Sequence, residues 1–364
     1  MVWKNNYDNG DLTIDVELTT NCNAKCPQCS RTDQLNNSEK KAWLPLIQVS
    51  LTKFKSWFSP LDLIHIKNIH FSGTYGDPGM CKELLEIVTY IIKNSNSTNI
   101  SINTNGGIRD ELYWWKIGAI GGKRLSIIFD IDGIDEKMHS FYRQNVSLKK
   151  VLDNMEAVLE TNARVKVLTV LFEHNENYLN QIQDMCRDLG VKEFDSVEGN
   201  NFQRGPEYPF RDPDGNYKVL KQVTRADREQ GLERLDRRVR DHRHKPKTLE
   251  EKKITCLAIE QKNLKVHATG IVAPCCFLST PLEMDSIYRK NKPVSYHITT
   301  SGKEGDEMSP IMKEYVDRYK DFMLPNRTLK EIVNDKWFTK ALMHSWLERK
   351  TSAYGCVKVC GNEL

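Results

Sequence analysis

Three cysteines near the start of the chain have a spacing that suits an iron-sulfur cluster. Cys22, Cys26 and Cys29 follow a C-x3-C-x2-C pattern shortly after the apolar run Leu12–Leu18. Three thiolates can bind three irons of a four-iron cluster and leave the fourth iron open, whereas four cysteines close the cluster and suit electron transfer. An open iron can take a ligand through that ligand's amine and carboxylate. The triplet therefore predicts a catalytic cluster.

Zinc is the alternative occupant of the same triplet. Structural zinc sites close with four protein ligands, usually two paired C-x2-C or H-x3-H units. No fourth Cys or His stands close to the triplet in the sequence. Zinc would need a distant fourth ligand, so the spacing favours the iron-sulfur cluster.

The first two hundred residues alternate between strand and helix signals. This alternation predicts parallel strands with crossover helices, an α/β fold. Six such units form a partial (β/α)6 TIM-like barrel, whose active-site loops follow the carboxyl ends of the strands. The predicted strands are Leu12–Leu18, Ile64–Ser72, Asn99–Asn103, Leu125–Ile131, Val165–Phe172 and Glu193–Val197, with helical patterns at Leu84–Ile91, Leu148–Val158 and Leu179–Leu189.

Polar residues and glycines follow the second, third and fourth predicted strands, at the edge of the sheet that also carries the triplet. Glycines let a ligand approach the backbone, carboxylates can accept bonds from an ammonium group, and side-chain amides can hold a ribose. Turn formation alone also selects these residue types, so each motif by itself is ambiguous. They are Gly73, Gly76 and Asp77, then Asn103 and Asn105, then Asp130 and Asp132.

The order of these motifs resembles that of the radical S-adenosylmethionine (SAM) enzymes over residues 12–205. The chain has C-x3-C-x2-C, G-T-Y-G-D-P, N-T-N-G and D-I-D-G, followed by Phe141-Tyr142-Arg143. The resemblance implies a 4Fe-4S cluster on the triplet with S-adenosyl-L-methionine on the open iron. It further implies reductive cleavage of SAM to a 5′-deoxyadenosyl radical, which abstracts a hydrogen atom from the substrate.

The same resemblance assigns residues to the cofactor. Gly73, Gly76 and Asp77 would lie beside the methionine amine, and Arg143 would pair with the carboxylate, which its guanidinium fork suits, or else form a surface ion pair. Two departures affect these assignments: Gln28 stands where the family usually has an aromatic residue that flanks adenine, and Asp77 replaces the usual Glu before proline. The residues expected near the ribose are Asn103, Asn105, and Asp130 or Asp132.

The C-terminal cysteines form a second group. The pattern C-x13-G-x4-C is followed near the end by C-x3-C, which resembles the SPASM extension or its shorter twitch form, over residues 254–364. The long form needs about seven cysteines, so the resemblance implies the twitch-like form with one auxiliary 4Fe-4S cluster. Zinc is again the alternative. The expected ligands are Cys256, Cys275, Cys356 and Cys360, with Cys276 either replacing Cys275 or packing as a small hydrophobe.

The chain thus divides into a radical SAM partial barrel at 1–205, a charged linker or lid at 206–253 and an auxiliary cluster domain at 254–364. The whole chain carries a net charge of +4, and residues 221–253 alone carry +5. Mixed-sign charge of this kind usually forms a solvated helix face, here expected over Thr224–Arg243, although nucleic acid is an alternative partner. A last helix over Leu329–Arg349 is expected to pack the C-terminal domain against the barrel.

The remaining expectations concern compartment and substrate. The chain has no apolar run of the roughly 18 residues that span a bilayer, and Met1–Gly10 lacks the apolar core of a signal peptide, which predicts a cytoplasmic protein. Its ten cysteines then serve as ligands rather than disulfides. A peptide or protein is the favoured substrate, with flavodoxin or ferredoxin as reductant. The alternatives are a nucleotide, a nucleic acid, a small metabolite that is dehydrogenated, or a non-catalytic electron-transfer protein.

Overall fold

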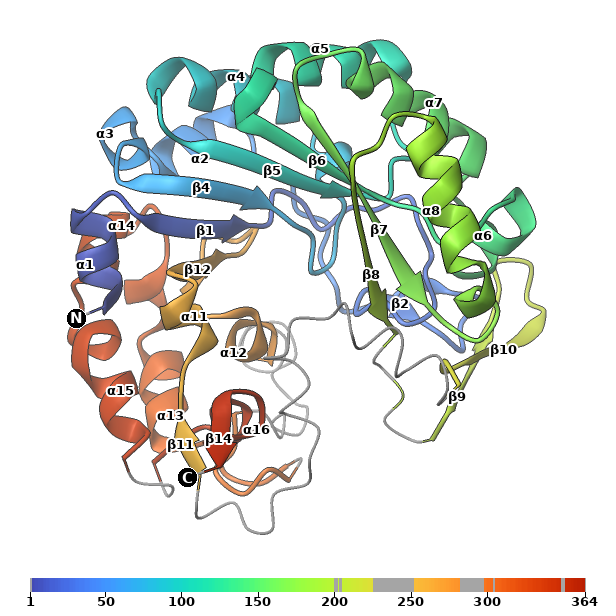
Figure 1. Cartoon of the computed structure of the whole chain (residues 1–364). Coiled ribbons are helices and arrows are strands. Elements are labelled where there is room, and N and C mark those ends of the chain that lie inside the picture. Colours follow the sequence, from blue (N-terminus) through green and yellow to red (C-terminus); the bar gives the residue numbers. More distant parts are fainter. Residues whose placement is uncertain are drawn as a thin grey trace.

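The structure, a computed structural model of the chain, describes residues 2–199, 202, 205–224, 252–281, 298–303, 305–347 and 351–363. Six parallel strands curve into an open arc with helices on its outer side, which confirms the partial barrel (Figure 1). Strand ends lie within two residues of the predicted ones. The strands are β1 (Leu12–Val16), β4 (Ile66–Phe71), β5 (Asn99–Thr104), β6 (Leu125–Asp130), β7 (Arg164–Leu171) and β8 (Glu193–Glu198).

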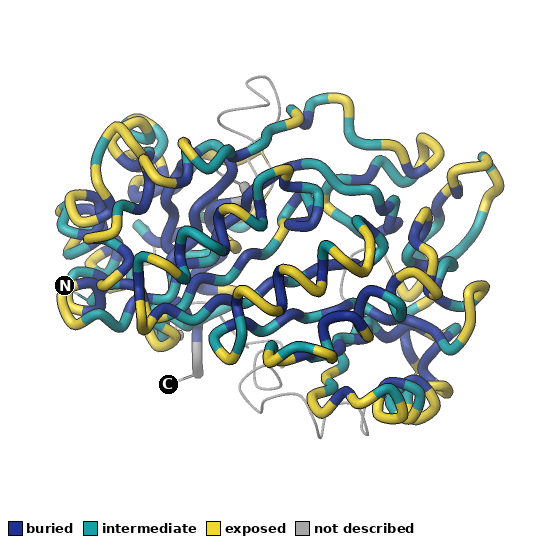
Figure 2. The backbone as a smooth tube through the Cα atoms, turned by 90° about the horizontal axis from the view of Figure 1, so that it is seen from above, coloured by how far each residue is buried: buried dark blue, intermediate teal, exposed yellow. Residues whose placement is uncertain are grey.

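The outer helices bury one apolar stripe each against the convex face of the sheet. In α4 (Leu84–Asn94) the buried residues recur at helical spacing. Ser or Asp caps several of these helices, as Ser147 does by accepting the Lys150 N–H. Seen from above, the helices alternate between buried and exposed positions (Figure 2). The others are α2 (Leu51–Trp57), α3 (Pro60–Leu63), α5 (Glu111–Gly121), α6 (Glu136–Tyr142), α7 (Leu148–Leu159) and α8 (Leu179–Asp188).

A strand from the C-terminal part extends the barrel sheet. β12 (Asn263–Val266) pairs in parallel with β1, and β13 (Val272–Ala273) pairs antiparallel with β12. Three acid-base pairs cross the β1–β12 seam, so charge complementarity helps to specify this pairing. The pairs are Asp11 with Lys262, Asp15 with Lys265, and Glu17 with His267.

The prediction of one helix over Leu329–Arg349 is wrong. α14 (Leu329–Val333) ends early, a π-helical turn covers Trp337–Ala341, and α15 (Leu342–Ser345) follows. The Asp335 carboxylate accepts the Trp337 N–H and also binds Arg318 and Arg327, each at 2.8 Å. An Asp that bonds the backbone locally competes with continuous helix, which explains the break.

The rest of the C-terminal part is mostly helical and packs beside β1. Trp3 of α1 (Val2–Asp8) meets Phe338 edge to face at 5.8 Å, which joins the two ends of the chain. A short antiparallel pair is formed by β11 (Lys252–Ile254) and β14 (Gly361–Glu363). The helices here are α11 (Leu257–Glu260), α12 (Cys276–Pro281), α13 (Pro310–Asp317) and α16 (Tyr354–Cys360).

A hairpin of β9 (Glu207–Arg211) and β10 (Tyr217–Lys221) contacts the cysteine loop after β1. The Tyr208 hydroxyl donates to the Pro27 carbonyl at 3.2 Å, and the Ser38 hydroxyl donates to the Arg211 carbonyl at 2.7 Å. Ser38 lies in the turn between the short strands β2 (Thr32–Asp33) and β3 (Glu39–Lys40). Beyond Thr224, the predicted helix at 224–243 lies outside the described residues. None of the described helices is both long and apolar enough to cross a bilayer.

Candidate functional site

The cysteine triplet lies in the loop that leaves the carboxyl end of β1. Cys26 is buried, whereas Cys22 and Cys29 are half-buried. Backbone bonds fix the loop, including Cys29 N–H to the Cys26 carbonyl at 3.1 Å and Lys25 N–H to the Gln144 carbonyl at 3.0 Å. The three thiols are therefore presented together by a loop tied to its neighbours.

Two side-chain donors point at the sulfur atoms. The Asn105 amide nitrogen lies 3.7 Å from Cys22 Sγ, and Arg143 Nη1 lies 4.0 Å from Cys26 Sγ. Burial raises the pKa of Cys26 to about 12 while Arg143 opposes the rise. Burial and the nearby Asp77 also raise the pKa of Cys22. Such thiols stay protonated until a metal displaces the proton, and donors beside the sulfurs then stabilise the bound thiolates.

Asp77 organises the loop after β4 and the residues after β5. Its two carboxylate oxygens accept four bonds, from Gly79 N–H (2.8 Å), the Thr104 hydroxyl (2.9 Å), Asn105 N–H (2.7 Å) and the Asn105 amide (2.8 Å). These four donors use the hydrogen-bonding capacity of both carboxylate oxygens. In this structure Asp77 therefore positions Asn105 beside Cys22 and has no oxygen left to accept a bond from an ammonium group.

The two glycines of G-T-Y-G-D-P are required by close backbone packing. A Cβ on Gly76 would lie 2.0 Å from the Thr19 carbonyl oxygen, and one on Gly73 would lie 1.5 Å from the Gly76 carbonyl oxygen. The Asp77 N–H also donates to the Asn21 carbonyl at 2.8 Å. The loop after β4 is thus pressed against the chain that leads into the cysteine triplet.

Arg143 joins the two carboxylates that follow β6. Its Nη1 lies 3.1 Å from Asp130 Oδ2, and its Nε donates to Asp132 Oδ2 at 2.6 Å. Asp132 is fully buried and accepts the Val170 N–H as well. Burial raises the pKa of Asp130 to about 7 against the opposing effect of Arg143. Of the two predicted roles of Arg143, the structure shows an ion pair, and this pair is buried rather than on the surface.

Asn103 and Asn105 belong to different environments. Asn105 is part of the network around Asp77 and Cys22, whereas Asn103 accepts from His70 Nε2 at 3.0 Å on the concave face of the sheet. The structure therefore brings Asn105 to the cysteine loop and places Asn103 beside a histidine that the motif comparison did not single out.

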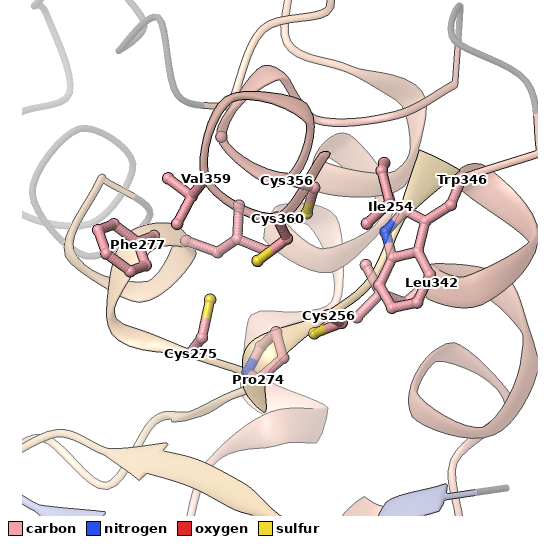
Figure 3. Close-up of a pocket in the computed structure, with 12 residues that line it drawn as sticks. Ile254, Cys256, Pro274, Cys275, Phe277, Leu342, Trp346, Cys356, Val359 and Cys360 are labelled. Atoms are coloured by element: carbon pink, nitrogen blue, oxygen red, sulfur yellow. The ribbon is translucent and has the colours of Figure 1, made fainter. Parts of the chain in front are cut away.

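The C-terminal cysteines line one small pocket (Figure 3). Cys256 precedes α11, Cys275 follows β13, and Cys356 and Cys360 lie one turn apart on α16. Their neighbours are mostly apolar, including Leu342 and Trp346. The cavity thus collects four cysteines from three separate segments of the chain.

The thiols around this cavity have unequal pKa values. A hydrogen bond from Cys256 lowers the pKa of Cys360 to about 7, whereas burial raises that of Cys356 to about 12. Burial and Cys356 also raise the pKa of Cys275. Among the described residues, no three His, Cys, Asp or Glu side chains converge closely enough to hold a single metal ion.

Cys276 lies apart from this cavity. It is exposed and its electrostatic neighbours are Lys265 and Asp15, whereas its neighbour Cys275 lines the cavity. The geometry therefore favours Cys275 over Cys276 as the ligand. The prediction that Cys276 packs as a small buried hydrophobe is wrong, because its side chain is exposed. Cys81 and Cys186 are buried in the core.

Motif spacing missed several residues that reach this region. Glu17, His70 and Lys265 stand at alternate strand positions without a recognised motif, and Tyr208 arrives from the β9–β10 hairpin. Strand alternation would have placed Glu17 and His70 on the concave face. The position of Lys265 could be predicted only by knowing that β12 pairs with β1.

The structure combines an open barrel of six parallel strands with a three-cysteine loop after the first strand. Comparison with known protein families identifies the class of protein that has this combination. Residues 16–186 match the Radical SAM superfamily. The chain therefore contains a radical SAM domain.

Curated relatives match this chain over about half of its length. The "Probable GTP 3',8-cyclase" of Methanococcus aeolicus is 27% identical over 183 residues, 49% of this chain and 56% of that protein. The "PqqA peptide cyclase" of Bradyrhizobium diazoefficiens is 24% identical over 195 residues, 53% of this chain and 47% of that protein. The matches thus span about half of these relatives.

Among solved structures, anSMEcpe with bound AdoMet superimposes with a TM-score of 0.55 at 15% identity, over 93% of this chain and 84% of that chain. Streptococcus suis SuiB bound to S-adenosylmethionine gives 0.50 at 13% identity, over 73% and 60%. At these identities the likeness establishes the fold. The chain therefore shares the fold of these two structures.

Proposed function

We propose that this protein is a radical SAM enzyme that holds a 4Fe-4S cluster on Cys22, Cys26 and Cys29 and binds SAM beside it. The observation that carries the proposal is the placement of three cysteines in one loop at the carboxyl end of β1, with donors from Asn105 and Arg143 aimed at their sulfurs. When bound, this pair of cofactors supplies a carbon-centred radical able to take a hydrogen atom from an unactivated carbon.

The residues of the chain hold and shape this site. Asp77 fixes Asn105, and Arg143 bridges Asp130 and Asp132 beneath Cys26. Gly73 and Gly76 keep the loop after β4 close to the triplet, where its backbone can contact the methionine end of SAM. The Asn105 amide and the partly exposed Asp130 are the groups proposed to face the ribose. Asn103 is not assigned this role, because it is bonded to His70 on the concave face.

A second 4Fe-4S cluster is proposed in the C-terminal cavity. Four cysteines surround an otherwise apolar space, a donor set that suits a closed cluster. Such a cluster has no open iron, and its role would be electron transfer. A flavodoxin or ferredoxin is the proposed external reductant, and the cytoplasm is the proposed compartment.

A peptide is the proposed substrate. One relative is named a PqqA peptide cyclase, and one structural neighbour of TM-score 0.54 carries a bound Kp18Cys peptide beside AdoMet. The second candidate is a nucleotide, which is favoured by the GTP 3',8-cyclase names of other relatives. The matches to both kinds of relative cover about half of this chain, so neither name decides the substrate.

The test is cleavage of SAM by anaerobically reconstituted protein under dithionite, measured as 5′-deoxyadenosine by mass spectrometry. We expect turnover by the wild type and none by Cys26→Ala, which removes a cluster ligand. Cys186→Ala is the matched control, because Cys186 is a buried cysteine on the apolar face of α8 and should leave cleavage intact. Full activity of Cys26→Ala would refute the proposal, as would a wild type that binds iron but never cleaves SAM.

A further inference from the structure

The concave face of the sheet carries a continuous row of polar side chains. The register aligns one residue from each of β12, β1, β4, β5 and β6, and all five are polar. A second polar row lies two residues earlier on four of these strands. The first row is Lys265, Asp15, His70, Ser101 and Ser126, and the second is Asn263, Thr13, Asn68 and Asn99.

A closed barrel fills its interior with bulky branched side chains such as Val, Ile and Leu. Here the same positions are polar, and all nine except Lys265 keep partial exposure. Polar side chains on an inner face do not stabilise a fold by apolar packing, and their burial is costly unless they have hydrogen-bond partners. The two rows therefore indicate that this face receives a polar ligand.

The acid-base part of the first row is already paired within the protein. Lys265 Nζ lies 3.2 Å from Asp15 Oδ2 and donates to the Ser72 hydroxyl at 3.1 Å, and Ser72 in turn donates to Asp15. Burial alone would raise the pKa of Asp15, but Lys265 and the hydrogen bond from Ser72 hold it below its usual value. Asp15 and Lys265 thus remain a charged, mutually neutralised pair at the edge of this face.

His70 and Asn103 are bonded to each other and each keeps one group for a ligand. His70 Nε2 faces Asn103 Oδ1 at 3.0 Å, and a carbonyl oxygen can only accept, so Nε2 carries the proton. In its neutral form the ring offers Nδ1 as an acceptor, and Asn103 offers its amide N–H groups as donors. One acceptor beside one donor is the hydrogen-bonding complement of an amide.

The charges on this face argue against a polyphosphate. Three cations that are at least partly buried here each have a carboxylate partner: Lys265 with Asp15, Lys166 with Asp195, and Arg143 with Asp130 and Asp132. Phosphate recognition relies on cationic groups whose charge the protein has not already matched. The described part of the concave face therefore fits an uncharged polar group better than a nucleoside triphosphate.

We infer that His70 and Asn103 form a substrate subsite that binds an amide group of a peptide, with Asn103 donating to its carbonyl oxygen and His70 Nδ1 accepting from its N–H. The inference rests on the proposed radical SAM activity and deepens it. Asn103 then serves the substrate rather than the ribose of SAM. Asp15 lies opposite His70 in the sheet register, and its partner Lys265 comes from β12 of the C-terminal part.

The experiment uses the full reconstituted protein with SAM and two probe pools. One pool is a perdeuterated peptide digest of a bacterial proteome, and the other is perdeuterated GTP. The readouts are total 5′-deoxyadenosine and the deuterium it contains. Asn103→Asp keeps an oxygen that can accept the bond from His70 Nε2 and removes the amide N–H groups that would donate to the substrate. His70→Ala removes the acceptor, and His344→Ala, at an exposed position on α15, is the control.

We expect deuterium transfer from the peptide pool and not from GTP. Asn103→Asp and His70→Ala should lower this transfer about tenfold, the loss expected for one hydrogen bond in a desolvated site, while peptide-free SAM cleavage and iron content stay unchanged. The control should match the wild type. Deuterium from GTP alone, from neither pool, or at wild-type level in both variants would overturn the inference. Absence of 5′-deoxyadenosine from the wild type would instead refute the proposed activity.

Discussion

Glu17, directly after β1, and His267, directly after β12, form a buried pair, with Glu17 Oε2 3.5 Å from His267 Nδ1 and neither side chain more than 1% exposed. The other oxygen of Glu17 accepts the Tyr75 N–H at 2.7 Å, inside the loop G-T-Y-G-D-P. His267 also begins the turn between β12 and β13, since its carbonyl accepts the Gly270 N–H. One carboxylate therefore links the segment that leads to Cys275 with the loop proposed to contact SAM.

Replacing Glu17 by Gln should weaken SAM binding without loss of iron. The variant keeps the side-chain shape but removes the charge that holds Tyr75 and His267, so we expect the Kd for SAM to rise about tenfold. Equilibrium dialysis of labelled SAM against anaerobic protein measures this. Asp11→Asn is the matched control, because Asp11 pairs across the same seam at a more exposed position. Equal Kd values for the two variants would show that the Glu17 contact has no role in SAM binding.

Gly76→Ala should disable the SAM loop. Its new Cβ would meet the Thr19 carbonyl at 2.0 Å, a backbone atom that can move only with the chain leading into the cysteine triplet. We expect SAM cleavage to fall at least tenfold, since small displacements in a reacting site are costly. Thr74→Ala, in the same loop, adds no atom and should retain most activity. Wild-type cleavage by Gly76→Ala would mean that the loop tolerates displacement.

Iron content should separate the two cysteine groups. The wild type should bind about eight irons per chain if each cysteine group holds a four-iron cluster. The double variant Cys356→Ala and Cys360→Ala should retain about four, because it removes two walls of the C-terminal cavity. Cys276→Ala should retain the wild-type count, since Cys276 is outside that cavity. Four irons together with one zinc in the wild type would instead establish the zinc alternative.

His139 should make stability fall as the pH drops. Burial lowers its pKa to about 4, and its Nδ1 accepts the Asp132 N–H at 3.2 Å, so the folded protein needs the neutral ring. The unfolded chain takes up the proton near its ordinary pKa of about 6.5, which favours unfolding as the pH falls from there towards 4. The cost by pH 5 is about 2 kcal/mol in the free energy of unfolding.

Urea unfolding of His139→Gln at pH 7.5 and pH 5 tests this. Gln cannot titrate but can still accept a bond, so the drop in unfolding free energy between the two pH values should shrink by about 2 kcal/mol relative to the wild type. Part of the drop should remain, because burial also lowers the pKa of His174 to about 4. An unchanged drop would mean that His139 is not a source of the pH dependence.

Much of the barrel could be predicted because its signals are local. Alternating strand and helix patterns place β1 and β4 to β8 within two residues, since apolar periodicity reports which face of each element is buried. The same patterns failed at Leu329–Arg349, where the bonds from Asp335 to Trp337, Arg318 and Arg327 interrupt a helix that periodicity alone would continue. Helix continuity there depends on partners from other segments.

By itself, the sequence determined that three cysteines would share one loop after the first strand and that polar motifs would follow the next strands, because spacing and strand order are properties of the chain. Tertiary structure alone decided what those side chains touch. The Asp77 carboxylate accepts bonds from protein donors, Cys276 lies outside the pocket that Cys275 lines, and Lys265 lies beside Asp15 although 250 residues separate them in the chain. The contact between Lys265 and Asp15 depends on the pairing of β12 with β1, a long-range register that no local pattern encodes.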